Sequence, residues 1–184
     1  MNQSLNRRTL LALIGSGLLA AFSIGWVWQV ADGTRDRATV EFNQAMTNHH
    51  AQAVSIGMIL HEMDVDPDLR TVARDIVLTQ QAQIGAMGAR LDTLGAPRSG
   101  AGHRMIGMAS PADIAELQTL SPEAAARFGI DLLIAHHRGG VQMARDFLSE
   151  GLDRHASLLA ERIVTAQESE IQLLEKLAAR YPGE

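Results

Sequence analysis

Phe128–Phe147, FGIDLLIAHHRGGVQMARDF, is the most informative segment of the chain, because a second version of this segment occurs earlier in the sequence. When His136-His137 is placed on His49-His50, the offset is 87 residues, and this offset aligns the residues after each pair without a gap. Each copy reads His-His, a spacer, and then Ile-x3-Gln-x2-[Gln/Glu]-Ile. The aligned positions are Ile76 with Ile163, Gln80 with Gln167, Gln83 with Glu170 and Ile84 with Ile171. A repeat of this length predicts two copies of one helical hairpin, and two hairpins make a four-helix bundle.

The apolar residues of both copies recur at helical spacing, and no strand pattern appears. Long helices are expected over about 39–63, 67–94, 122–150 and 153–180, in that order along the chain. Asp66 is the expected N-cap of the second one, because a proline comes directly after it, and Gly95 is expected to end that helix. The inward stripe predicted for the third long helix is Phe128, Leu132, His136, Gly140, Met143 and Phe147.

Four segments together resemble the DUF305 family: HHRGGVQMA, FNQAMTNHHAQAV, the trailing Ile-x3-Gln-x2-Glu-Ile pattern and the connector MIGMASPADIAEL. The resemblance covers about Thr39–Leu177. The family is a group of bacterial envelope proteins with a ferritin-like fold, and some of its members bind copper. The resemblance therefore implies an all-α, ferritin-like four-helix bundle. It implies no activity, because most members of the family have none assigned.

The N-terminal 31 residues are expected to form a transmembrane helix that anchors the chain. Thr9–Ala31 contains no charged residue and is long enough to cross a bilayer. Arg7 and Arg8 precede it, which places the N-terminus in the cytoplasm. Residues 32–38 would then be a polar linker, and the bundle over 39–181 would face the periplasm or the cell exterior. The alternative is a cleaved signal peptide and a secreted bundle, although its apolar core would be unusually long.

Composition excludes several classes of function. The chain has a net charge of −5, and all of its acidic residues come after the apolar segment, which argues against a nucleic-acid partner. The absence of cysteine excludes disulfides, zinc–cysteine sites and thiol nucleophiles. Seven histidines and eight methionines remain, so imidazole and thioether are the nitrogen and sulfur ligands that the chain can offer a metal.

The two His-His pairs predict a metal site. Adjacent residues on a helix point about 100° apart, so one ring of each pair lies on the apolar stripe and the other on its flank. Pseudo-twofold symmetry between the copies would bring four imidazoles together near mid-bundle. Imidazole with thioether favours copper, with methionine selecting Cu(I) over Cu(II). The predicted metal ligands are His49, His50, His136, His137, Met46 and Met143.

Three further polar residues are expected near these ligands. Gln80 and Gln167 interrupt apolar stripes at equivalent positions, and an amide there can accept the ring N–H of a ligand histidine and fix its tautomer. The alternative is that each amide completes a hydrogen-bond network of its own. Glu170 lies nearer the edge of its stripe, where it either holds a histidine or is a solvated helix residue.

The connector over 95–110 is a second candidate for metal binding. It contains His103, Met105 and Met108 on a glycine-bearing loop, which suits the capture or relay of a soft ion. Loops of this kind are also often only linkers.

The function expected from these features is an extracytoplasmic protein that binds or buffers copper without turnover. Its alternative is an interaction or scaffold module of the cell envelope, in which the His-His pairs are structural and the partner is an envelope protein or a second copy of the chain. A metal-dependent oxidase comes third, because the Glu-x-x-His motif of ferritin-like di-iron oxidases is absent. The His-Glu-x-x-His and phosphate-loop motifs of other enzyme classes are absent as well. For a site led by imidazole, affinity is expected to fall from about pH 7 to 5, since an unperturbed histidine titrates near pH ~6.5.

Overall fold

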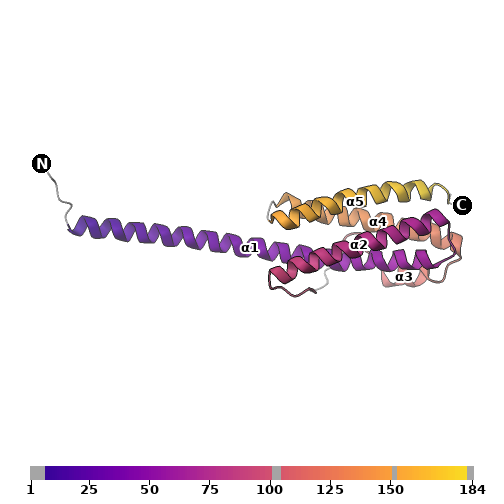
Figure 1. Ribbon diagram of the computed structural model, residues 1–184, viewed down its shortest axis with the longest axis horizontal. Coiled ribbons are helices and arrows are strands. Elements are labelled where there is room, and N and C mark those ends of the chain that lie inside the picture. Colours follow the sequence, from indigo (N-terminus) through magenta and orange to yellow (C-terminus); the bar gives the residue numbers. More distant parts are fainter. Residues whose placement is uncertain (1–6, 101–104, 151–152, 182–184) are drawn as a thin grey trace. The chain divides into compact units, whose positions relative to one another are not determined.

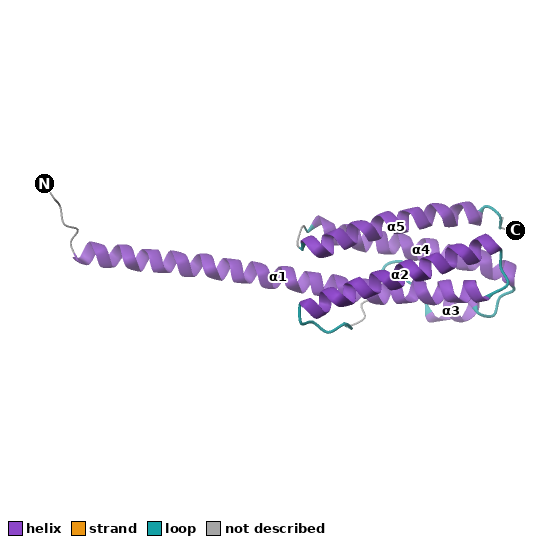
Figure 2. Cartoon of the chain, in the orientation of Figure 1, coloured by secondary structure: helices purple, strands orange, loops and turns teal. Residues whose placement is uncertain are grey.

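The computed structural model describes residues 7–100, 105–150 and 153–181, while the side chains of residues 7–32, 34 and 35 are not described. Every regular element in the described ranges is a helix, which confirms the all-α prediction (Figures 1 and 2). The helices are α1 (Arg7–Glu62), α2 (Pro67–Thr93), α3 (Pro111–Leu117), α4 (Pro122–Ser149) and α5 (Arg154–Ala178). The chain divides into two compact units, Met1–Arg37 and Ala38–Glu184, and the second holds the bundle.

The ends of α2 are set by local sequence. Asp66 is its N-cap, and the Asp66 side chain accepts a hydrogen bond from the Asp68 backbone N–H at 2.8 Å. Gly95 adopts a φ of 65°, a left-handed conformation that favours glycine, just past the end of the helix. The Ala96 N–H then donates to the Leu91 carbonyl at 3.0 Å, which satisfies a backbone acceptor that the helix end would leave free. Both predicted boundaries are confirmed.

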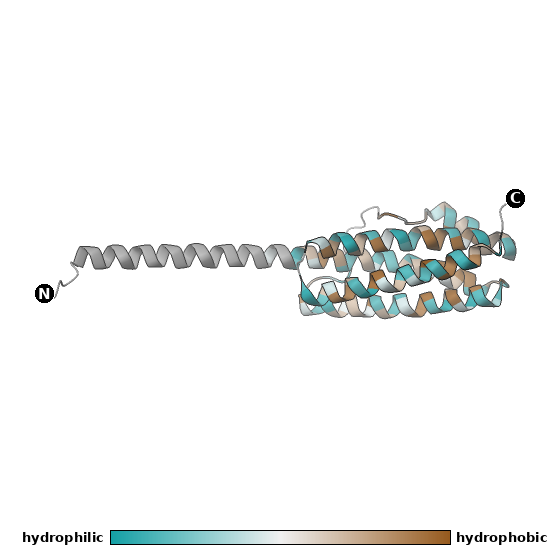
Figure 3. Cartoon of the chain, turned by 90° about the horizontal axis from the view of Figure 1, so that it is seen from above, coloured by the Kyte–Doolittle hydropathy of each residue, from teal (hydrophilic) through white to brown (hydrophobic). Residues whose placement is uncertain are grey.

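The bundle core consists of two apolar clusters with a polar layer between them. One cluster includes Leu60, Ile76, Leu133 and Leu174, and the other includes Phe42, Met87, Phe147 and Ile163. Each cluster takes residues from α1, α2, α4 and α5, so these helices share one interior. Hydrophobic (brown) and hydrophilic (teal) residues alternate along them in Figure 3. Along each helix, the stretch between the two clusters holds the polar residues of the repeat.

The buried face of α4 differs from the predicted stripe. Ile130 and Leu133 are fully buried, whereas Phe128 and Leu132 are half-buried and pack at the edge of the first cluster. The buried face of α4 is also broad, because small residues such as Gly129 lie against neighbouring side chains; a Cβ there would meet Leu60. The apolar periodicity alone predicts which residues form the helix. It does not predict which face of the helix turns toward the core.

Among the residues available for description, no helix combines the length and apolar character needed to cross a bilayer. The predicted anchor, Thr9–Ala31, lies outside the residues whose side chains are described. The predicted linker over 32–38 is helical and continuous with α1.

Candidate functional site

The polar layer of the bundle contains the four paired histidines, and none of them has exposed surface. His49 on α1 and His136 on α4 lie against each other, with ring centroids 3.8 Å apart and ring planes 35° apart. Within each pair the centroids are 6.3 Å apart for His49 and His50 and 6.1 Å apart for His136 and His137. The fold therefore brings the two copies of the motif together at one level of the bundle.

Backbone carbonyls fix the tautomer of the two central rings. His136 Nε2 lies 2.9 Å from the His49 carbonyl oxygen, and His49 Nε2 lies 3.3 Å from the Ile106 carbonyl oxygen. Because a carbonyl oxygen only accepts hydrogen bonds, Nε2 carries the proton in both rings.

The two outer rings have equivalent partners in the two copies. His50 Nε2 donates to Gln83 Oε1 at 2.6 Å, and His137 Nε2 donates to Glu170 Oε2 at 2.9 Å. Glu170 thus contacts a paired histidine and is mostly buried, with a side chain 13% exposed. The partner in the first copy is Gln83, which aligns with Glu170 in the repeat.

Gln80 and Gln167 make no hydrogen bond to the rings in the described ranges, and their role beside the ligands stays a prediction. Both are fully buried, and neither amide hydrogen-bonds to any residue in the described ranges. Gln167 lies against α4 where Gly140 leaves room, because a Cβ on Gly140 would collide with its amide oxygen. The ring N–H groups are held instead by Gln83, by Glu170 and by two backbone carbonyls.

The Nδ1 atoms of all four rings have no hydrogen-bond partner within the described part of the chain. With the proton on Nε2, a neutral ring presents an Nδ1 lone pair, which is an acceptor and a metal ligand. Four such lone pairs and two unpaired amides are buried in one layer. Burying polar atoms without partners costs free energy, so these are the atoms that a buried water or a bound ion would satisfy.

Burial keeps His49, His50 and His136 neutral. Desolvation lowers the pKa of His49 to about 4 and that of His50 to about 3, although the hydrogen bonds that these rings donate to Ile106 and Gln83 act in the opposite direction. Desolvation, reinforced by the neighbouring imidazoles, lowers the pKa of His136 to about 2. The expectation of proton competition between pH 7 and 5 assumed an unperturbed pKa, so it does not hold for these three rings while the bundle is folded.

The connector between the two hairpins packs directly on the histidine layer. The Ile106 carbonyl and the Gly107 Cα lie so close to α4 at Gly139 that a Cβ there would collide with the carbonyl oxygen. On α1, Gln52 makes two hydrogen bonds to the backbone of Ala109, at 2.9 and 2.8 Å. Both glycines of the His-His-Arg-Gly-Gly motif are therefore required for steric reasons. Gly139 leaves room for the connector, and Gly140 leaves room for the Gln167 amide.

The predicted thioether ligands belong to the apolar cluster that adjoins the histidine layer and to the connector. Met46 is fully buried in the second apolar cluster, and Met143 is half-buried against that cluster. Met105 and Met108 are half-buried in the connector. His103 lies outside the described residues. Whether any of these residues binds a metal stays a prediction.

In the described ranges, no group of three or more His, Asp or Glu side chains is already spaced to hold a metal ion.

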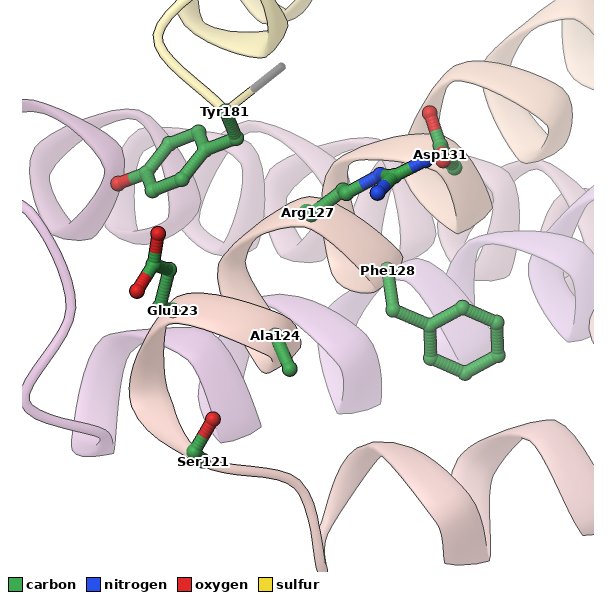
Figure 4. A pocket seen from close by; sticks show the side chains of 7 residues that line it. All are labelled: Ser121, Glu123, Ala124, Arg127, Phe128, Asp131 and Tyr181. Carbon is green, nitrogen blue, oxygen red and sulfur yellow. The ribbon is translucent and has the colours of Figure 1, made fainter. Parts of the chain in front are cut away.

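A surface pocket of about 620 Å³ opens away from the histidine layer, near the start of α4 and the end of α5 (Figure 4). It is lined by Ser121, Glu123, Ala124, Arg127, Phe128, Asp131 and Tyr181. It contains none of the predicted site residues, and its carboxylates and guanidinium mix both signs of charge.

The family model described as "Domain of unknown function (DUF305)" matches residues 39–178. The chain belongs to the DUF305 family. A comparison with curated proteins finds no match.

Solved structures of DUF305 proteins share the fold. A DUF305 fragment from Deinococcus radiodurans is 36% identical with a TM-score of 0.73, covering 78% of this chain and 96% of that one. A DUF305 protein from Streptomyces coelicolor, assigned as secreted, is 34% identical with a TM-score of 0.74, covering 81% and 98%. CopM in its Cu(I)-bound form is 23% identical with a TM-score of 0.67, covering 79% and 98%. At that identity CopM shows the fold alone.

Two residues of this DUF305 bundle matter for the site although the sequence pattern gives them little weight. Gln83 holds His50, and the signal for it is its alignment with Glu170 in the repeat. Gln52 clamps the connector, and nothing in the periodicity of α1 distinguishes it from a solvated residue.

Proposed function

We propose that this protein is an extracytoplasmic copper-binding protein, attached to the membrane by its N-terminal segment, that binds or buffers the ion without turnover. The observation that carries the proposal is the set of four buried imidazoles whose Nε2 atoms are engaged and whose Nδ1 atoms have no described partner.

The chemistry of the donors supports copper. Neutral imidazole binds first-row transition metals, and copper lies at the top of their affinity order. The hydrogen bonds at Nε2 orient each ring and increase its basicity, as partners of metal-bound histidines generally do. Met46 and Met143 lie on the helices that carry the rings, in the adjoining apolar cluster, and supply thioethers that favour Cu(I).

The likeness to CopM points the same way. Structures of CopM with Cu(I), Cu(II) and Ag exist on a fold that this chain matches over 78–79% of its length. These ions are bound by CopM. That this chain also binds copper is part of the proposal.

In the described ranges, the candidate ligands are not closed around one point. Binding would therefore require small shifts of the imidazole rings that keep their Nε2 hydrogen bonds, or a thioether that joins them. An ion that must rearrange its ligands is exchanged more readily than one in a rigid cage, which suits buffering or hand-over better than a structural role.

The proposal is tested by metal titration of the full chain after removal of metals with a chelator. Cu(I) and Cu(II) are added in competition with chromophoric chelators of known affinity, to the wild type, to the double variant His136→Ala/His137→Ala and to the control His155→Ala. His155 is exposed on α5, so its loss is expected to leave affinity unchanged. The double variant is expected to lose at least tenfold in affinity for Cu(II).

Circular dichroism shows whether the double variant is folded, and the single variant His50→Asn provides a second test on the first copy. If the variants fold and bind copper as tightly as the wild type, the His-His pairs are structural. The alternative function, an interaction module of the envelope, then becomes the better account.

A further inference from the structure

The two copies of the repeat hold their outer histidine in the same way but with different chemistry. His50 Nε2 donates to the neutral amide of Gln83 at 2.6 Å, and His137 Nε2 donates to the carboxylate of Glu170 at 2.9 Å. In both copies the acceptor lies 33 residues after the histidine and on the partner helix of the same hairpin. Pseudo-symmetry therefore fixes the geometry and leaves one difference, a negative charge.

That charge lies where it can act on a bound cation. His137 has no exposed surface and the Glu170 side chain is 13% exposed, so solvent screens the pair weakly. Gln83, which is also buried, offers the same hydrogen bond without a charge. The bundle interior contributes no other carboxylate to this layer among the described residues: its remaining members are imidazoles and the amides Gln80 and Gln167.

A carboxylate behind a ligand imidazole stabilises a doubly charged ion more than a singly charged one. It increases the donor strength of the ring, and its charge offsets that of the metal in a medium of low dielectric constant. An all-neutral set of imidazoles and thioethers leaves Cu(I) with one uncompensated charge and Cu(II) with two.

We propose that Glu170 is the residue that sets the oxidation-state preference of the histidine layer, because its contact with His137 favours Cu(II) over Cu(I) relative to the Gln83–His50 half. This inference rests on the proposed copper function. Glu170 acts through His137 and is a positioning residue, with no ligand role assigned to it.

The test compares three variants of the full chain: Glu170→Gln, the exchange Glu170→Gln/Gln83→Glu, and the control Glu168→Gln. The control removes the same charge two residues away, from a side chain that is 44% exposed and pairs with Arg145. For each protein the affinities for Cu(I) and Cu(II) are measured by competition, and the reduction potential of the bound copper is measured independently.

Glu170→Gln is expected to shift the ratio of Cu(II) to Cu(I) affinity by about tenfold toward Cu(I), which for one electron corresponds to a rise in potential of about 59 mV. The exchange variant is expected to recover most of the wild-type ratio, because the carboxylate reappears at the equivalent place. The control is expected to stay near the wild type. A purely structural role of Glu170 would change both affinities by the same factor.

The inference is overturned if Glu170→Gln changes the ratio no more than the control does, while the wild type still binds copper through the paired histidines. If the wild type binds neither ion, the proposed function fails first, and the titration of the unmodified protein shows it before any variant is compared.

Discussion

At the scale of single residues, the protein keeps imidazoles in the interior of a helical bundle by giving each ring one acceptor. The hydrogen bonds at Nε2 offset part of the cost of burial, yet the lowered pKa values of His49, His50 and His136 show that desolvation dominates. The same burial that keeps Nδ1 unprotonated makes the metal-free fold sensitive to acid.

The metal-free protein is expected to lose stability as pH falls below about 6.5. In the unfolded chain these histidines titrate near their ordinary pKa of 6.5, whereas in the fold the pKa of His49 is about 4 and that of His136 about 2. Between those values the unfolded state binds protons that the native state does not, so the free energy of unfolding falls as pH falls. Each of the two rings contributes a loss of about 2 kcal/mol between pH 6.5 and 5.

Urea unfolding of the chelator-treated protein at pH 7.5, 6.0 and 5.0 measures this loss. A free energy of unfolding that stays constant from pH 7.5 to 5 would show that the rings are hydrated or already protonated in the fold.

The repeat in the sequence was enough to predict which histidines meet, but not which residues hold them. Gln80 and Gln83 both lie on the side of α2 that turns inward, almost one turn apart. Which of the two reaches His50 depends on the rotation of α2 against α1, and apolar periodicity does not fix that rotation. For the same reason the buried stripe of α4 runs through Ile130 and Leu133, next to the predicted Phe128 and Leu132.

At the scale of elements, the connector after α2 is part of the site and is more than a link between hairpins. Ile106 supplies the acceptor of His49, and Gln52 clamps Ala109 by two hydrogen bonds. The methionines of this segment are visible in the sequence. Its docking could not be predicted, because it depends on a backbone contact at Gly139 that leaves no pattern of side chains.

Gly139→Ala is expected to destabilise the bundle by about 1–2 kcal/mol. The added methyl group would collide with the Ile106 carbonyl and force the connector away from α4, an overpacking cost of about 1–3 kcal/mol that exceeds the gain of about 0.5–1 kcal/mol from removing a helical glycine. The matched control is Gly85→Ala on α2, where a Cβ meets nothing within 4 Å and only the gain applies.

Thermal or urea unfolding of the two variants gives the comparison, and hydrogen exchange at Ala109 reports on the connector itself. Equal stabilisation by both substitutions would mean that the connector does not press on Gly139.

At the scale of the whole molecule, the internal repeat predicted the architecture correctly: two hairpins, α1 with α2 and α4 with α5, enclose one interior with a polar layer between two apolar clusters. A repeat constrains long-range contacts in a way that local periodicity does not, because each copy must bury its apolar face against the other. The short α3 and the connector lie outside the repeat, so the repeat does not predict how they pack on the bundle.

The N-terminal segment is expected to keep the chain in the membrane fraction. Thr9–Ala31 has no charged residue, and a helix of that length spans about 30 Å of hydrocarbon. Fractionation with a carbonate wash, then N-terminal sequencing of the mature protein, tests this expectation. A chain that begins near Asp32 and is released by the wash would identify the segment as a cleaved signal peptide.

The proposed copper site requires that the buried imidazoles bind metal through Nδ1 while Nε2 stays protonated and hydrogen-bonded. Long-range ¹H–¹⁵N spectra of the histidine-labelled full chain, recorded before and after addition of diamagnetic Cu(I) or Ag(I), test it most directly. We predict that the metal-free spectra show the Nε2–H tautomer for His49, His50, His136 and His137, and that the metal shifts Nδ1 in members of both pairs while Nε2–H persists. Nδ1 signals that do not move, or shifts confined to His61, His103 and His155, would contradict the account.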